Sequence, residues 1–223
     1  ELREVLASCG EAAAAGSGPD GSVLADQVAE ATRQVNQAVK VPEALAKELR
    51  QGGTQVVVVP ADLNNLAEVD RLWETASSDG REISILVNNA GLGSHGTFSD
   101  ADTWDQELSE INVNMLALTQ LMKRALPAMR ANGSGRILNV ASTAAFLPGP
   151  NMAVYHATKS YVLSLSESVA EELSGTGVSV TALCPGATAT NFFDTADMHG
   201  VTLLKFAKPA SVESVASAGW TGT

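Results

Sequence analysis

RILNVA at Arg136–Ala141 and VSVTALC at Val178–Cys184 are two short apolar runs, separated by a longer segment of helical periodicity at Val154–Leu173. Short, nearly continuous apolar runs are typical of parallel strands that are buried on both faces. A helix that connects two such strands makes a βαβ unit. This stretch therefore predicts an α/β fold with a parallel sheet.

The same alternation of strand and helix extends from this stretch toward both ends of the chain. Apolar and β-branched runs predict further strands at Thr54–Val59 and Ile83–Asn88. We expect a doubly wound parallel sheet, in a single domain, over residues 41–223. The helices that would cover it are predicted at Glu43–Gln51, Leu66–Ser77, Trp104–Ala131, Val154–Leu173 and Ser211–Trp220.

Residues 1–40 have a different pattern, because their apolar residues recur at helical spacing. They predict two helices joined by a turn rich in glycine, serine and proline. An apolar stripe this short favours a helix packed on its own core over a coiled-coil dimer. The sequence thus predicts an atypical helical segment ahead of the main domain.

Composition and charge exclude several classes of partner. The chain has 223 residues, a net charge of −11 and a pI near 4.6, so it repels a phosphate backbone and nucleic acid is not expected to bind. Cys9 and Cys184 have neither the number for a disulfide framework nor metal-ligand spacing, so no metal site is expected. Apolar stretches are too short for a membrane span and the first residues do not resemble a signal peptide. We expect a cytoplasmic protein that does not bind membranes.

Three polar side chains have the chemistry of an acid-base site. Tyr155 and Lys159 lie four residues apart on a predicted helix, so their side chains project from the same face. An ammonium beside a phenol favours the ionised form, which brings a group with a pKa of about 10 toward neutral pH. Taken alone, such a pair also occurs as an ordinary helix-surface pair. Ser142 directly follows a strand, where it can hold a substrate oxygen or, alternatively, cap a helix.

These residues occur together with Asn88-Asn89-Ala90-Gly91, Asn114 and Pro185-Gly186, in the order and approximate spacing of the classical short-chain dehydrogenase/reductases. The resemblance covers roughly residues 43–219. It implies a Rossmann-like fold and an NAD(P)-dependent oxidoreductase of the carbonyl reductase or alcohol dehydrogenase type.

The resemblance also implies roles for four catalytic residues. Tyr155 resembles the family's acid-base, and Ser142 the residue that orients the substrate. Lys159 resembles the lysine that lowers the tyrosine pKa and binds the nicotinamide ribose. Asn114 resembles the residue that holds a proton-relay water. Each role suits the chemistry of its side chain.

A cofactor site for NAD or NADP follows from the same resemblance. Asp62 looks like the residue that meets the adenine, and Thr190 like the threonine near the diphosphate. Segment 191–209 looks like a variable lid whose apolar residues suit an apolar or bulky carbonyl or alcohol substrate. The full set of expected cofactor-binding residues is Asp62, Leu63, Asn88, Ala90, Gly91, Tyr155, Lys159, Pro185, Gly186, Thr188 and Thr190.

The sequence departs from the family's pattern in the N-terminal βαβ unit, which is incomplete. Before Glu43 there is no strand followed by a TGxxxGxG turn and a helix, and no second strand that would choose between NAD and NADP. Backbone amides at a helix N-terminus normally receive the pyrophosphate, so their loss is expected to cost cofactor affinity. The stretch GSGPDG at residues 16–21 matches GxGxxG by letter but follows an alanine-rich helical stretch, and we interpret it as a loop.

This departure leaves a gap in the expected sheet between Thr54–Val59 and Ile83–Asn88. Residues 1–40 can supply strands, the two strands can pair directly, or a partner chain can cover the edges. The relatives often assemble through their last strand and tail, which implies a homo-oligomer, but this chain stops soon after the helix predicted at Ser211–Trp220. The alternative to an active oxidoreductase is a non-enzymatic scaffold or fragment that has lost dinucleotide binding.

Overall fold

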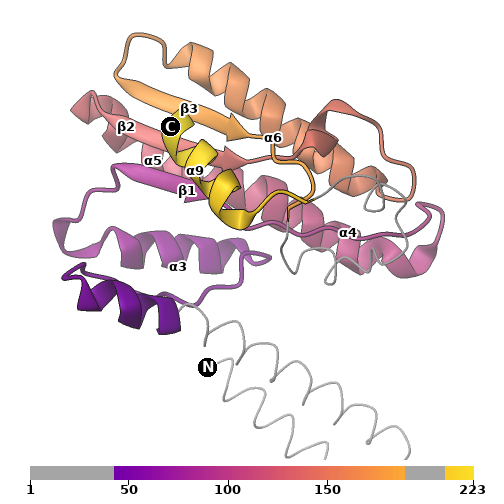
Figure 1. Cartoon of the computed structure of the whole chain (residues 1–223), viewed down its shortest axis with the longest axis horizontal. Helices are drawn as coiled ribbons and strands as arrows, with labels where there is room; N and C mark the ends of the chain where they lie inside the picture. Colours follow the sequence, from indigo (N-terminus) through magenta and orange to yellow (C-terminus); the bar gives the residue numbers. More distant parts are fainter. Residues whose placement is uncertain (1–42, 189–208) are drawn as a thin grey trace, which may run out of the picture. The chain divides into compact units, whose positions relative to one another are not determined.

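The computed structural model describes residues 43–188 and 209–223 (Figure 1). The chain divides into two compact units, residues 1–60 and 61–223. The helices predicted in residues 1–40 lie outside the described residues. So do Thr190 and the predicted lid, of which Pro209 alone is described. None of the helices in the described ranges is long and apolar enough to cross a membrane.

In the first unit, residues 43–51 form a helix and residues 54–60 have no regular secondary structure. The guanidinium of Arg50 donates to the Val56 carbonyl at 2.8 Å and holds this segment to the end of the helix. The strand predicted at Thr54–Val59 is therefore wrong. A β-branched run forms a strand only where its backbone groups pair with a neighbouring strand, and this segment belongs to no ladder among the described residues.

The second unit is built on a parallel sheet of three strands, β1 (Ile85–Asn88), β2 (Gly135–Val140) and β3 (Val178–Leu183), in the order β1-β2-β3 (Figure 1). The register pairs Asn88 with Asn139 and Val140 with Leu183, so the carboxyl ends of the strands lie along one edge. The predicted α/β class with a parallel sheet is confirmed. Each of these strands begins and ends within two residues of its predicted bounds.

Helices cover both faces of this sheet. α5 (Leu118–Asn132) and α6 (Ala153–Glu172) pack on one face, where Ile137 of β2 and Val180 of β3 join the apolar core. α9 (Val212–Gly222) packs on the opposite face, where a Cβ at Gly219 would lie 2.9 Å from Leu183 Cδ2 and 3.2 Å from Leu138 Cδ2. The absence of a side chain at Gly219 thus lets α9 approach the strands closely.

The segment predicted as one helix at Trp104–Ala131 is correct in extent but wrong in its regularity. It consists of α4 (Trp104–Ile111), a π-helical segment η3 (Asn112–Ala117), and α5. π-helical turns insert an extra residue into a helix and are frequent at functional sites. Here the π-helical segment contains Asn114, which the sequence singles out for another reason.

Shorter elements complete the unit. α3 (Leu66–Ala76) is joined to α5 by Asp70, whose carboxylate accepts hydrogen bonds from Gln120 and Arg124. Three short helical turns connect the larger elements, namely η1 (Ser78–Gly80), η2 (Ala101–Thr103) and η4 (Thr143–Phe146).

β1 is the least covered strand of the described sheet. Ile85 and Val87, which alternate toward the same face, are 41% and 49% exposed, whereas Ile137 on β2 is fully buried. β1 also pairs with β2 alone among the described strands. Apolar side chains that stay this exposed stabilise the fold less than fully buried ones, because less of their surface is removed from water.

Candidate active site

Tyr155 and Lys159 lie one helical turn apart near the start of α6, and both are buried, at 9% and 5% exposure. The Lys159 ammonium lies 5.8 Å from the centroid of the Tyr155 ring. It donates a hydrogen bond to the Val140 carbonyl at the end of β2, at 2.9 Å. Lys159 thus joins the helix that carries Tyr155 to the carboxyl edge of the sheet.

The environment shifts the pKa of both groups in a direction that burial explains. Burial of Lys159 lowers its pKa to about 8. Burial of the Tyr155 phenol raises its pKa, the hydrogen bond with Ser142 lowers it, and the negative charge of Glu110 raises it again. The net direction for Tyr155 is upward, opposite to the lowering expected from Lys159, because burial of the phenol has the largest effect on its pKa. At neutral pH the phenol is therefore protonated and placed to donate a proton.

Ser142 follows β2 directly and has two contacts. Its backbone is extended and its Oγ accepts a hydrogen bond from Ala144 N at 3.1 Å, so it caps the short turn η4. The same side chain hydrogen-bonds Tyr155. The cap and the contact with the phenol are therefore both present, and capping orients the hydroxyl at the edge of the sheet.

Asn114 links three parts of the site. Its Nδ2 donates to Leu92 O at 2.9 Å and to Thr158 Oγ1 at 3.0 Å, and its Oδ1 accepts from Leu92 N at 2.8 Å. Thr158 Oγ1 in turn donates to the Tyr155 carbonyl at 2.8 Å. The π-helical segment, the loop that follows β1 and the start of α6 are thereby held together. Thr158 is not among the residues that the sequence predicts, because a buried threonine in a helix has no distinctive pattern.

Gly91 lies in that loop between two polar groups. A Cβ at this position would be 3.2 Å from Lys159 Nζ and 3.4 Å from Asn114 Oδ1, so any side chain would crowd both. At Gly186, after β3, a Cβ would meet nothing within 4 Å. The Pro185 carbonyl accepts from Thr143 N at 2.9 Å, and Thr188 Oγ1 donates to Gly186 O at 3.0 Å.

On the other side of the sheet edge, the predicted adenosine residues are less enclosed. Asn88 turns its side chain into the core, where Nδ2 donates to Asn139 Oδ1 at 2.8 Å. Asn139 in turn donates to Ser166 Oγ at 2.9 Å, which ties β1 and β2 to α6. Ala90 is exposed. The Asn88 side chain therefore serves the strand pairing.

Asp62 and Leu63 lie in a turn before α3. Asp62 is exposed, and its Oδ1 accepts a hydrogen bond from Asn64 N at 2.9 Å. Asn64 Oδ1 accepts from Asn112 Nδ2 at 2.7 Å, which attaches this turn to the π-helical segment. Leu63 is partly buried.

Glu110 is a functional candidate that the sequence analysis did not predict. It lies on α4, four residues before Asn114, and is 1% exposed. Burial raises its pKa to about 7, the nearby Ser94 acts in the opposite direction, and the charge of Glu107 raises it. The spacing of Glu107, Glu110 and Asn114 places them on one helical face. This spacing is the one feature of the sequence that could have indicated a role for Glu110. Glutamates on a helix are nevertheless usually solvated.

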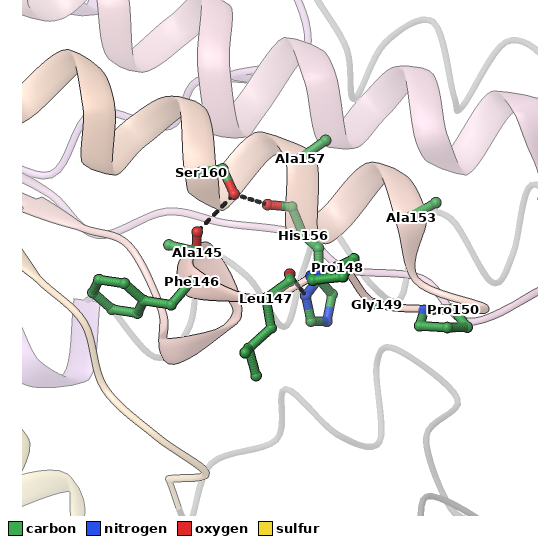
Figure 2. A pocket seen from close by; sticks show the side chains of 10 residues that line it. All are labelled: Ala145, Phe146, Leu147, Pro148, Gly149, Pro150, Ala153, His156, Ala157 and Ser160. Carbon is green, nitrogen blue, oxygen red and sulfur yellow. Dashed lines mark hydrogen bonds between the residues drawn. The ribbon is translucent and has the colours of Figure 1, made fainter.

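A hollow of about 550 Å³ is lined by residues of η4, of the loop that follows it and of the first half of α6 (Figure 2). Figure 2 shows Phe146 and Leu147 projecting from the loop, with the His156 ring next to Leu147. His156 Nδ1 lies 2.7 Å from the Leu147 carbonyl, and a Cβ at Gly149 would overlap the imidazole. The residues that line it are Ala145, Phe146, Leu147, Pro148, Gly149, Pro150, Ala153, His156, Ala157 and Ser160.

The described residues fit one half of a nicotinamide dinucleotide better than the other. A buried cation at Lys159 and side-chain-free positions at Gly91 and Gly186 leave room for a ribose and a nicotinamide near Tyr155. Among the described residues, the loop after β1 contains Gly91, Gly93 and Gly96, but η2 separates this loop from α4, so the N-terminus of α4 does not directly follow these glycines as it would in the usual cradle of a pyrophosphate.

Comparisons with known proteins agree with the geometry. The profile of the family described as short chain dehydrogenase matches residues 21–199. The ketoacyl reductase HetN of a Nostoc species is 33% identical over 138 residues, which are 62% of this chain and 48% of the reductase. The chain thus spans about half the length of this curated relative.

Two solved structures have a similar fold. A short-chain dehydrogenase from Sphingobium yanoikuyae in complex with NADPH is 33% identical, with a TM-score of 0.71 over 81% of this chain and 69% of that one. A bulky-bulky ketone specific alcohol dehydrogenase from Comamonas testosteroni is 30% identical, with a TM-score of 0.67 over 81% of this chain and 67% of that one.

Proposed function

The chain belongs to the short-chain dehydrogenase/reductase family of oxidoreductases, and we propose that it is an NAD(P)-dependent oxidoreductase of the carbonyl reductase or alcohol dehydrogenase type. The observation that supports this most is the buried, hydrogen-bonded group formed by Tyr155, Ser142, Lys159 and Asn114 at the carboxyl edge of the sheet. Open α/β sheets bind their ligands at this edge.

Tyr155 is the proposed proton donor. Because its pKa is raised, the phenol carries its proton at neutral pH, and it can pass that proton to a carbonyl oxygen that becomes a hydroxyl group. Ser142, which hydrogen-bonds the phenol, would hold the same oxygen and orient it. In the reverse direction Tyr155 must first be ionised, the neighbouring Lys159 ammonium would stabilise that phenolate, and the phenolate would then accept the alcohol proton and become the neutral phenol.

Asn114 holds the architecture of this site through its bonds to Leu92 and Thr158. Its proposed role in a proton relay is supported by its position next to the turn of α6 that carries Tyr155. The proposed relay would return a proton to Tyr155 after each turnover.

NAD or NADP would supply or accept the hydride. Lys159 would hold the nicotinamide ribose, with Gly91 and the turn after β3 beside it, and Asp62 would contact the adenine. The remaining expected residues stay proposals for the same site, namely Leu63, Asn88, Ala90, Pro185, Gly186, Thr188 and Thr190.

The proposed substrate is a small carbonyl compound or alcohol with an apolar part. The exposed side chains of Phe146 and Leu147 and the hollow beside them support this choice. The relatives are named for a ketoacyl substrate and for bulky ketones, which have this character.

Thermal unfolding of the purified chain, with and without millimolar NADPH or NADH, tests cofactor binding. A ligand that binds only the folded state at about 100 times its Kd stabilises that state by about 2.7 kcal/mol. We expect a rise in Tm with at least one of the two cofactors. A Tm that neither cofactor changes would contradict the proposal.

Turnover of aryl and alkyl ketones by a Tyr155→Phe variant tests the chemistry. Loss of an acid-base group costs about 10² to 10⁴ in rate, and the Tm should change little. Tyr161→Phe is the matched control, because the Tyr161 hydroxyl bonds Thr119 Oγ1 instead of the site residues. Equal rates in the two variants would contradict the role of Tyr155.

A second function is favoured by one observation, the absence of a TGxxxGxG turn from the sequence. In that case the chain is a scaffold or fragment that retains the catalytic residues but does not bind a dinucleotide. An unchanged Tm with both cofactors, together with no turnover by the unmutated chain, would support this second function over the first.

A further inference from the structure

Glu110 is a buried carboxyl group that the proposed reaction does not use. Its side chain is 1% exposed, and among the described residues neither Oε atom has a hydrogen-bond partner of standard geometry, although Ser94 lies near enough to affect the group. A buried polar group without full hydrogen bonding destabilises a fold. An apolar side chain of similar size would pack here at lower cost, so the carboxyl group calls for a reason other than stability.

The position of Glu110 points to the catalytic helix. It lies four residues before Asn114, so both project from the same side of the continuous α4–η3 helix. Asn114 on that side bonds Thr158 of α6, and Thr158 bonds the Tyr155 carbonyl. Glu110 is therefore one helical turn away from Asn114, which joins this helix to α6, the helix that carries Tyr155.

The charges around Glu110 come from several elements. Glu107 lies on the same helix and is also buried, and its negative charge acts against ionisation of Glu110. Tyr155 on α6 is affected by the charge of Glu110. The other titratable groups on the packed elements are Lys159, His156, Tyr161, Glu167, Glu171 and Glu172 on α6, His95 in the loop next to Ser94, Asp102 on η2 and Asp105 on α4.

We propose that Glu110 is a positioning residue that controls Tyr155 through its own charge. While the carboxyl group is neutral, it adds nothing to the effect of burial, which already disfavours ionisation of the phenol. Once the carboxyl group has lost its proton to solvent, its negative charge disfavours the phenolate further. This inference rests on the proposed function for its catalytic meaning, but the coupling between the two groups does not require that function.

The coupling can be measured without cofactor, substrate or turnover. The chain contains two tyrosines, Tyr155 and Tyr161, so a chain labelled with ¹³C at tyrosine Cζ has two resonances, which Tyr161→Phe assigns. From about pH 5 to about pH 9, we expect the Tyr155 resonance to shift in one step with a midpoint near 7, as Glu110 ionises. The Tyr161 resonance should stay constant.

Glu110→Gln is the decisive variant, because it keeps the shape and removes the charge. We expect the step in the Tyr155 resonance to disappear, and the apparent pKa of Tyr155 to fall. Glu107→Gln is the matched control on the same helix face, and it should keep the step and move its midpoint downward. If Glu110→Gln does not fold, the unmutated chain still decides, because the absence of any step in its Tyr155 resonance overturns the proposal.

Kinetics then separate this inference from the proposed function. In an active enzyme, Glu110→Gln should retain turnover at about pH 6 and lose the pH dependence centred near 7. A step in the Tyr155 resonance without turnover would support the coupling and contradict the function. Turnover whose pH profile and Tyr155 resonance are the same in Glu110→Gln and the unmutated chain would support the function and overturn the inference.

Discussion

The two sides of the sheet edge differ in how completely the chain encloses them. On the side of Tyr155, Lys159 and Asn114, the polar groups are buried and bonded to one another across the loop after β1, the π-helical segment and α6. On the side of β1 and Asp62, Ile85 and Val87 are exposed, and Asp62 is bonded only within its own turn among the interactions described. The half proposed for acid-base chemistry is therefore part of the core, whereas the half expected to receive adenosine has no comparable support among the described residues.

The largest expected effect compares one isoleucine in each region. Ile137→Ala on β2 removes a side chain from the centre of the core and should lower the free energy of unfolding by about 2 to 5 kcal/mol. Ile85→Ala on β1 removes a side chain that is 41% exposed and should cost less, about 1 kcal/mol. Urea unfolding of both variants measures this difference. Similar losses of unfolding free energy would show that the Ile85 side chain is as buried in solution as that of Ile137.

The second prediction concerns the free energy of unfolding as a function of pH. The pKa of Glu110 is about 7 in the folded chain and near its ordinary value of 4.5 when unfolded. Between these values the folded chain keeps a proton that the unfolded chain has released, so stability falls as pH rises from 4.5 to 7 and stays lower above 7. The total loss is at most about 3 kcal/mol.

Glu110→Gln isolates this effect from the other carboxyl groups. We expect the unfolding free energy of the variant to exceed that of the unmutated chain above pH 7, and the two to converge toward about pH 4. Glu68 and Asp70, whose hydrogen bonds with arginine lower their pKa, contribute equally to both proteins. A constant difference at every pH would show that Glu110 does not titrate in this range.

The third prediction compares two amide pairs. Asn139→Leu leaves the Asn88 amide buried without its acceptor, which should cost about 1 to 3 kcal/mol of unfolding free energy. The exposed pair of Asn112 and Asn64 is the control, and Asn64→Ala should change stability by less than about 0.5 kcal/mol. Equal costs for the two variants, measured in urea, would mean that the buried pair is accessible to water.

The smallest expected effect tests the less enclosed side directly. Asp62→Ala should leave Tm nearly unchanged and raise the Kd for NADPH or NADH by about 2- to 10-fold, because an exposed single contact contributes about 1 kcal/mol. Titration calorimetry on the full chain measures the Kd. An unchanged Kd would remove Asp62 from the cofactor site and confine that site to the side of Lys159.

Much of the fold was predictable because the responsible patterns are local. The strands at Ile85–Asn88, Gly135–Val140 and Val178–Leu183 are short apolar runs, and the helices between them have the 3.6-residue period. Where a pattern needs a distant partner the prediction was wrong, as for Thr54–Val59, whose β-branched run has no pairing strand among the described residues. The π-helical segment at Asn112–Ala117 was also not predicted, since its apolar spacing differs little from that of an α-helix.

The sequence by itself determined the family and the parallel α/β class and proposed the acid-base residues, because these depend on residue types in a fixed order along the chain. Only the tertiary structure decided what surrounds each group: that Asn88 turns to Asn139, that Lys159 reaches Val140, and that the carboxyl group of Glu110 is buried. Burial and charge act through space, between residues distant in the sequence. They therefore set the pKa values, and with them the chemistry, only once the chain has folded.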